Sequence, residues 1–281
     1  MKKLFLLASL SLLVPTFLIG CASQETLKSS TSNEKGTLSL VANGEDFVRQ
    51  GFVSKDGWRI SFDHVYVTLA DVAAYQTDPP FDPDAGDTIK AKETVILLDK
   101  PKTVDLAEDP EDAQPILVAQ VEAPTGQYNV LSWEVVEAGE GPAEGQTIVL
   151  DGTATKDGQT IDFLIGFNQR LNYACGEFVG DERKGILKAT AESEVETTFH
   201  FDHIFGDANA PADDPLNTGA VGFQPMVTLA EDGTLEVDVA ILKKELSSED
   251  YQTFQKAIAG LGHVGEGHCT EQLSVINSNE K

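Results

Sequence analysis

The stretch Trp58-Arg-Ile-Ser-Phe-Asp-His-Val-Tyr-Val-Thr-Leu69 has the alternation of side chains that a β-strand requires. Successive side chains of a strand point to opposite faces of its sheet. One face therefore carries Ile60, Phe62, His64 and Tyr66, and the other carries Val65, Val67 and Leu69. Because both faces are apolar towards the end of the stretch, the sequence predicts a central strand of a large sheet.

Further segments along the chain also have the composition of strands. Hairpin-type dipeptides, Asp151-Gly152, Asp157-Gly158 and Asp232-Gly233, separate several of them. Many short strands without helices between them predict a mainly β fold, either an antiparallel β-sandwich or a barrel-like domain. The expected strands are Thr37–Ala42, Thr94–Leu98, Ile116–Glu122, Tyr128–Glu137, Gln146–Ala154, Thr160–Phe167, Gly185–Ala191, Glu196–His203 and Leu235–Ile241.

One helix is expected near the C-terminus, over about residues 247–261. Ser247 is suited to cap its first turn, and Asp250 follows three residues later. Glycines at 260 and 262 end the helical pattern. The side chains expected on its apolar face are Tyr251, Phe254, Ile258 and Leu261.

The N-terminus has the order of a secretory signal peptide. Lys2 and Lys3 precede an apolar run that ends at Leu18, and Gly20 stands just before Cys21. The four residues Leu18-Ile19-Gly20-Cys21 resemble the lipobox of bacterial lipoproteins. The resemblance implies that residues 1–20 are removed, and that Cys21 becomes the lipidated first residue and anchors the chain to a membrane. An ordinary secretory signal that places a cysteine there is the alternative.

Residues 21–36 are rich in Ser, Thr, Glu and Lys, and they predict a flexible tether. Residues 37–281 are then expected to form a single large β-rich domain. Within it, Val104-Asp-Leu106 and Pro124-Thr-Gly-Gln-Tyr128 resemble elements of uncharacterised bacterial envelope lipoproteins with a β-sandwich core. That resemblance covers a small part of the chain and implies fold and location, not activity. In a diderm organism, Ala22 in place of aspartate after the cysteine favours the outer membrane.

The formal charge of the chain is −26, and loss of Lys2 and Lys3 with the signal peptide would leave −28. Such a surface repels nucleic acid, so we expect no nucleic-acid partner. Divalent cations, basic partners or a saline environment suit it better. Solubility in a salty medium accounts for the charge without any ligand.

Cys175 and Cys269 remain as a pair once Cys21 is lipidated. In an oxidising compartment they are expected to form a disulfide, closing a loop of about 95 residues worth roughly 4 kcal/mol in the chain-entropy model. The alternative is that both are thiolate ligands of zinc or copper(I).

Four of the five histidines occur in two short segments, and these are the candidate metal ligands. His200-Phe-Asp-His203 includes Asp202, and His263-Val-Gly-Glu-Gly-His268 includes Glu266. Imidazole is a common ligand of zinc and copper, and carboxylates complete or orient such sites. In an extended chain His200 and His203 would point to opposite faces, so both can meet one ion only if the strand ends or bulges near His203.

Two acidic loops, 78–87 and 207–214, offer carboxylates that calcium prefers, but neither matches the regular calcium-binding loop and solvated loops are the favoured interpretation. A nucleophile elbow, a phosphate-binding loop with Lys-Ser/Thr and a His-Glu-x-x-His helix are all absent from the sequence.

The sequence therefore favours a lipid-anchored, extracytoplasmic protein of the cell envelope that binds zinc or copper for capture, buffering or delivery to an envelope partner. Two alternatives stay open. One is a structural or interaction lipoprotein without metal, and the other is a metal-dependent envelope enzyme using the same histidines.

Overall fold

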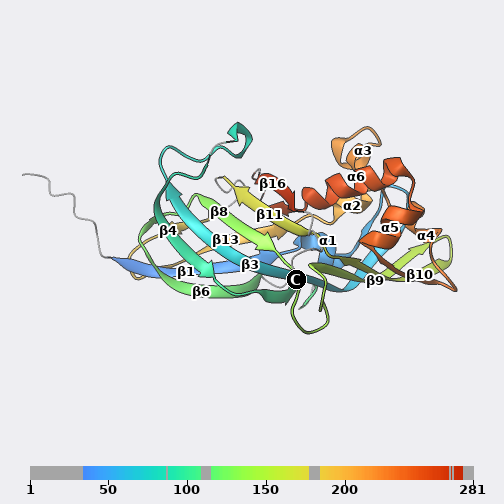
Figure 1. Ribbon diagram of the computed structural model, residues 1–281, viewed down its shortest axis with the longest axis horizontal. Helices are drawn as coiled ribbons and strands as arrows, with labels where there is room; N and C mark the ends of the chain where they lie inside the picture. Colours follow the sequence, from blue (N-terminus) through green and yellow to red (C-terminus); the bar gives the residue numbers. More distant parts are fainter. Residues whose placement is uncertain are drawn as a thin grey trace, which may run out of the picture. The chain divides into compact units, whose positions relative to one another are not determined.

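Strand β3, Arg59–Thr77, is the longest strand and the centre of the larger sheet (Figure 1). It begins in the stretch that predicts a central strand and continues eight residues beyond Leu69 through small and apolar side chains. Both of its edges are paired, as a central strand requires. Val67 pairs with Ile148 of β9 and with Val104 of β5, so these two strands lie on opposite edges of β3.

The computed structural model describes residues 34–86, 88–108, 115–176, 184–265, 267 and 269–274. The expected signal peptide, Cys21, nearly all of the expected tether, Glu266 and His268 lie outside the described residues. From Asn33 onward the chain forms one compact unit.

Because β3 is long, each of its edges pairs with more than one segment of chain. On one edge β8, Val130–Val135, is followed after a loop by β9, Ile148–Lys156. The opposite edge carries three segments, which are β2 (Phe52–Val53), β5 (Lys102–Asp105) and β4 (Ala91–Leu98).

The same arrangement repeats further out in this sheet. β10, Gln159–Phe167, pairs with β9, and β11, Arg170–Cys175, pairs with β8. The outermost strands are β14, Thr234–Asp238, beside β10 and β16, Cys269–Ser274, beside β11.

The smaller sheet has the order β15-β13-β1-β6. Its members are β1 (Lys35–Asn43), β6 (Ile116–Pro124), β13 (Glu192–Phe199) and β15 (Gly262–His263). A separate two-stranded pair joins β7, Gly126–Gln127, to β12, Ile186–Leu187.

One face of the large sheet is covered partly by the smaller sheet and partly by helices. The ring of Trp133 on β8 packs against Phe199 of β13, with centroids 6.5 Å apart. Phe167 of β10 packs against Phe254 of a helix, at 5.8 Å. Tyr173 on β11 joins the two regions, because its ring contacts Trp133 and its hydroxyl donates to the carbonyl of Ile258. The second layer therefore changes from strands to helices over one continuous core.

The helices are short except for the last. α6, Ser248–Ala259, begins at a Ser247 cap whose hydroxyl accepts from the amide of Asp250, as the sequence predicts. It buries Phe254, Ala257 and Ile258 against the sheet. The others are α1 (Glu45–Gln50), a 3-10 turn η1 (Pro83–Ala85), α2 (Asp202–Phe205), α3 (Pro215–Gly219), α4 (Gln224–Val227) and α5 (Val239–Glu245).

The expected mainly β, sandwich-like fold is confirmed, with corrections of detail. Two pairings are parallel, β1 with β13 and β10 with β14, because chain crossovers bring these segments together from far apart. The segment Gly185–Ala191 contributes only the two residues of β12. The expected strand Leu235–Ile241 stops at Asp238, whose side chain accepts from the amide of Ile241 and starts α5.

The predicted disulfide is also present. Cys175 of β11 and Cys269 of β16 are bonded and face each other in the register of the two strands. The pair is therefore a crosslink rather than two thiolate ligands. It attaches the segment that follows α6 to the large sheet.

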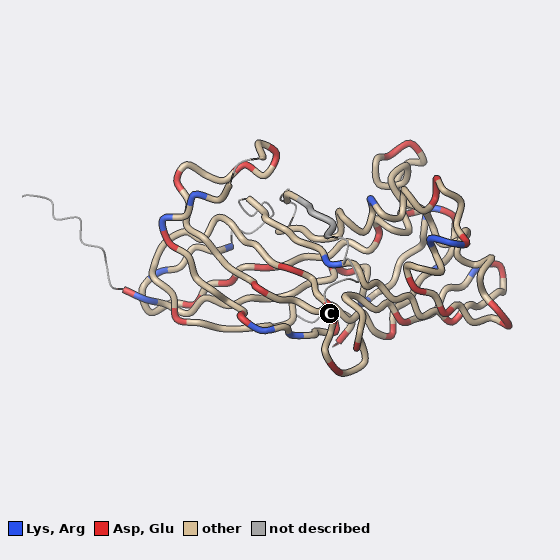
Figure 2. Tube along the Cα trace, viewed as in Figure 1, with Lys and Arg blue, Asp and Glu red and all other residues tan. Residues whose placement is uncertain are grey.

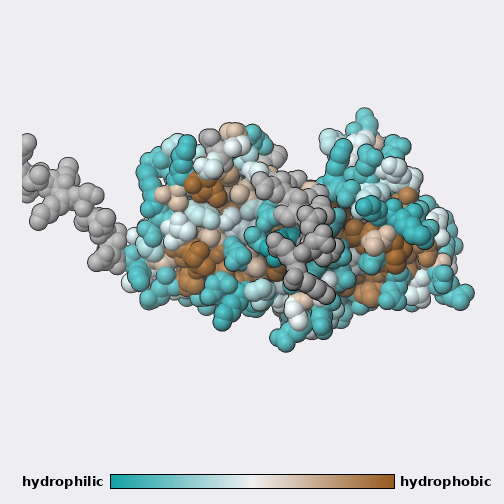
Figure 3. All heavy atoms as spheres, in the orientation of Figure 1, coloured by the Kyte–Doolittle hydropathy of each residue, from teal (hydrophilic) through white to brown (hydrophobic). Residues whose placement is uncertain are grey.

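The surface is strongly acidic, with Asp and Glu distributed over strands, helices and loops (Figure 2). Apolar atoms on the face shown in Figure 3 form separate patches between hydrophilic ones. Within the described residues, none of the helices has both the length and the apolar character needed to cross a bilayer.

Gly152 on β9 provides a test of the central pairing. A Cβ atom there would lie 2.1 Å from the carbonyl oxygen of Ser61 and 2.9 Å from Cα of Phe62, beside the irregularity in the β3–β9 register. We expect Gly152→Ala to lower the free energy of unfolding by about 1–3 kcal/mol through overpacking. Gly139→Ala is the matched control, because a Cβ there meets no atom within 4 Å. Equal urea midpoints for the two variants would contradict the close approach of β3 and β9.

Candidate metal centre

The segment that carries His200 and His203 lies where the smaller sheet gives way to the helices. β13 ends at Phe199, so the expected strand Glu196–His203 is too long by four residues. The chain turns at once, with the amide of His203 donating to the carbonyl of His200, and α2 begins at Asp202. The strand therefore ends before His203, which is the condition under which both imidazoles can reach one ion.

Three imidazoles from two distant segments meet at this turn. The ring centroids of His200 and His203 are 5.4 Å apart. His263 of β15 places its ring 4.7 Å from His200 and 5.2 Å from His203. Backbone pairing brings the segments together, because the amide of His200 donates to the carbonyl of Leu261 and Thr198 pairs with His263.

The carbonyl oxygen of Gly260, at the end of α6, fixes the orientation of two of these rings. It lies 2.7 Å from Nδ1 of His203 and 3.1 Å from Nε2 of His263. Since a carbonyl only accepts, both nitrogens carry the hydrogen. The lone pair of His203 is then on Nε2 and that of His263 is on Nδ1. Metal-binding histidines commonly use a main-chain carbonyl in this way to hold the ring that coordinates the ion.

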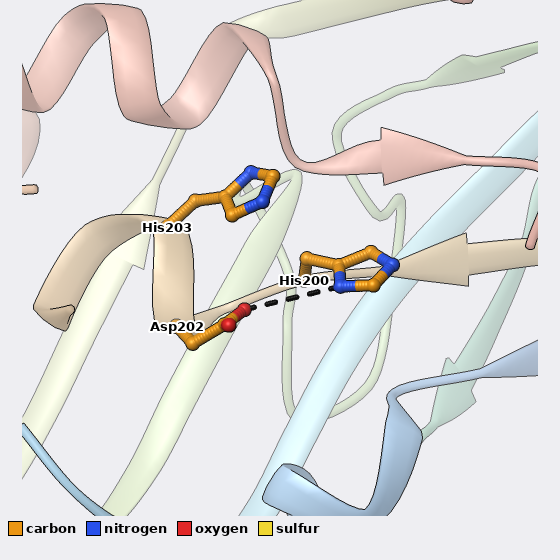
Figure 4. Close-up of side chains that lie close together, drawn as sticks. All are labelled: His200, Asp202 and His203. Atoms are coloured by element: carbon orange, nitrogen blue, oxygen red, sulfur yellow. Dashed lines mark ion pairs between the residues drawn. The ribbon is translucent and has the colours of Figure 1, made fainter. Parts of the chain in front are cut away.

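His200 and Asp202 form the buried part of the cluster (Figure 4). Their side chains are only 15% and 7% exposed. Oδ1 of Asp202 is buried without a hydrogen-bond partner, and Nδ1 is the nitrogen of His200 that faces it. Nδ1 of His200 is 3.9 Å from Oδ1 of Asp202, which is too long for a hydrogen bond.

The electrostatics keep His200 neutral. Burial, together with repulsion from His263 and His203, lowers the pKa of His200 to about 3, while the main chain of Gly265 acts weakly in the opposite direction. Burial also raises the pKa of Asp202, although His203 opposes this shift. A neutral imidazole has a lone pair to offer at neutral pH, so His200 is ready to act as a ligand.

His200, Asp202 and His203 each offer one ligand atom, and these atoms lie within 4.8 Å of one another. Among the described residues, this is the group that brings three such donors so close together. The ring of His263 lies next to the rings of His200 and His203. Two imidazole nitrogens and a carboxylate oxygen are donors that zinc and copper accept.

The other candidate residues from the sequence, His268, Glu266 and His64, do not belong to the group of three ligand atoms. His268 and Glu266 lie outside the described residues. The segment that contains them leaves β15 and returns at Cys269, where the disulfide attaches it to β11. His64 belongs to a different environment, since its Nδ1 lies 2.6 Å from Asp105 and its ring stacks on Tyr66.

Several carboxylates of the two acidic loops have partners within the protein. Asp82 caps η1 through the amide of Asp84, and Asp78 pairs with Lys92. Asp207 accepts from the amide of Asn209, and Asp214 caps α3. Asp87 lies outside the described residues. Calcium binding by these loops stays a prediction.

Beside His203, a cleft of about 450 Å³ lies between α3 and α6. The sequence does not predict this cleft, because α3 is a short helix inside a Pro- and Asp-rich loop. The sequence did offer a signal for the carbonyl of Gly260. The predicted helix ends just before His263, and the last carbonyls of a helix have no partner within the helix. The residues that line the cleft are His203, Pro215, Leu216, Thr218, Gly219, Thr253, Lys256 and Ala257.

Comparisons of the chain with protein-family models, with curated proteins and with solved structures gave no match. The function of the protein is therefore inferred from the geometry of the histidine cluster.

The lowered pKa of His200 predicts a pH dependence of stability in the metal-free protein. Between about pH 6.5 and 3 the unfolded chain binds a proton that the folded chain does not, so stability falls as the pH falls, by at most about 1.4 kcal/mol per pH unit. Asp202 acts with the opposite sign above its ordinary pKa, because its raised pKa makes the folded chain hold the proton longer.

Urea unfolding with a chelator present, from pH 4 to 7, tests this expectation. His200→Gln keeps Asp202 but removes the titrating ring, so its stability should decrease less steeply towards acid than that of the wild type. Parallel pH profiles for the two proteins would show that His200 is not buried in its neutral form.

Proposed function

We propose that this protein binds a transition-metal ion, zinc or copper, through His200, Asp202 and His203, with His263 beside them. The observation that carries the proposal is the group of three ligand atoms, one each from His200, Asp202 and His203, that lie within 4.8 Å of one another next to two rings oriented by one carbonyl. His268 and Glu266 are the further ligands that the sequence suggests. The role of the protein would be metal capture, buffering or delivery.

The unpartnered Oδ1 of Asp202 favours a ligand over a purely structural cluster. Leaving a buried polar group without a partner costs about 1–3 kcal/mol. A cluster that only stabilised the fold would be expected to pair such atoms, as Asn217 does with Asp207 and with the carbonyls of Ala210 and Pro211. In Figure 4, Nδ1 of His200 is the nitrogen that faces Asp202, so a cation between the two side chains would bind Nδ1 of His200 and Oδ1 of Asp202.

The donors suit zinc or copper better than calcium or magnesium, which prefer oxygen ligands. Ligands of a tetrahedral zinc ion are about 2.0–2.2 Å from the metal, which places donor atoms about 3.3 Å apart. Donors that already lie within 4.8 Å of one another therefore need only small side-chain movements. The charge of Asp202 and the overall charge of −26 attract the cation.

The N-terminal sequence supports a location for this activity. Lipidation of Cys21 would anchor the domain at the extracytoplasmic side of a membrane, with residues 22–36 as a tether. A metal site on such a tether could exchange ions with an envelope partner.

Metal titration of the full chain purified in detergent tests the proposal. We expect zinc or copper to bind with micromolar affinity or better, because buried nitrogen and oxygen donors are already gathered. His200→Gln and His203→Gln should each weaken binding about tenfold or more, the scale seen even for outer-shell changes. His64→Gln is the matched control and should leave affinity unchanged. Absence of binding, or an equal loss in the control, would contradict the proposal.

Asp202→Asn separates metal binding from a structural role. In the metal-free protein the amide replaces a buried carboxylate that has one unpartnered oxygen, so stability should stay the same or rise by about 1 kcal/mol. In the metal-bound protein the same variant should lose affinity, because the anionic ligand is gone. Melting temperatures with chelator and with zinc measure both effects. A large loss of stability without metal would instead assign Asp202 to the fold.

A further inference from the structure

We propose that the cleft between α3 and α6 binds a small organic carboxylate, whose oxygen joins the coordination of the metal beside His203. This inference rests on the proposed metal site and names the class of molecule that the site would accept along with the ion.

The cleft and the cluster of candidate ligands have one residue in common, His203, which belongs both to the group of three ligand atoms and to the wall of the cleft. Its Nδ1 is held by Gly260, so Nε2 is the nitrogen that would bind the ion. Small-molecule sites usually occupy about 300–1,000 Å³, a range that includes this cleft of about 450 Å³.

The chemistry of the walls points to an anion with an apolar part. Pro215, Leu216 and Ala257 supply apolar surface. The one charged side chain among the residues that line the cleft, all of them described, is Lys256, in a chain with 46 acidic and only 20 Lys and Arg residues. Within the described residues its ammonium group has no carboxylate partner, unlike Lys92 or Lys244.

The charge of the metal site favours the same ligand. His200 and His203 coordinate as neutral rings, and Asp202 contributes one negative charge, so a divalent ion would leave a net positive charge of one. An ion held by His200, Asp202 and His203 alone, without His263, His268 or Glu266, keeps one tetrahedral position for an outside oxygen. A carboxylate would neutralise the centre, and its apolar part would pack on the walls of the cleft. Lys256 would add a second, solvent-screened attraction at the rim.

Cobalt(II) is a suitable probe, because its visible absorption changes when a ligand enters its coordination shell. The full chain loaded with cobalt would be titrated with benzoate and with acetate. We expect benzoate to change the spectrum and to bind about tenfold more tightly than acetate, because its ring buries apolar surface.

Two variants test the cleft itself. Lys256→Gln should weaken benzoate binding about two- to fivefold, the range of an exposed ion pair. Its control, Lys243→Gln on α5, should change nothing. Gly219→Leu should reduce benzoate affinity further while cobalt still binds, because a side chain at 219 has open space around it and occupies the cleft.

The outcomes separate the two proposals. If cobalt binds but benzoate leaves its spectrum unchanged, the carboxylate site is wrong and the metal site stands. Equal benzoate affinities for Lys256→Gln and Lys243→Gln, or for Gly219→Leu and the wild type, would also overturn the carboxylate site. If cobalt does not bind to the wild type, both proposals fail together.

Discussion

The two hydrogen bonds accepted by the carbonyl oxygen of Gly260 hold the candidate site together. One joins His203 on α2 to the end of α6, 57 residues further along the chain, and the other orients His263 of β15, three residues after Gly260. The backbone around them supports the same contact, because Leu261 accepts from His200 and Gly262 pairs with Phe199. Gly262 permits this approach, since a Cβ there would lie 2.7 Å from the ring of Tyr173. The close packing of α6 on the large sheet therefore determines where the imidazoles meet.

The side chains that form the cluster lower the stability of the fold, because polar groups are buried there without full hydrogen bonding. Asp202 is buried with an unpaired oxygen, whereas Asn217 in the neighbouring loop pairs both its oxygen and its nitrogen. Burial of the neighbouring phenylalanines offsets this cost. Phe199, Phe201 and Phe205, which alternate with the histidines along the chain, are fully buried. An aromatic core of this kind keeps water from satisfying the lone pairs and lowers the pKa of His200.

Much of the fold could be predicted from local patterns, and the site only in part. Alternation around Val65 and Val67 indicates the central strand, and the Ser247 cap indicates α6, because both signals lie within a few residues. The parallel pairing of β1 with β13 depends on segments more than 150 residues apart, which local periodicity does not encode. The histidine motifs indicate the ligands, but the turn after Phe199 and the role of Gly260 depend on tertiary packing.

The metal environment itself is the most direct test of this account. An X-ray absorption spectrum at the metal edge of the zinc- or copper-loaded protein reports the atoms bound to the ion. The account predicts imidazole nitrogens together with carboxylate oxygen at about 2.0–2.2 Å, the usual range for these ligands on zinc. A shell of oxygens without imidazole, or a spectrum that is identical in His200→Gln, would contradict it.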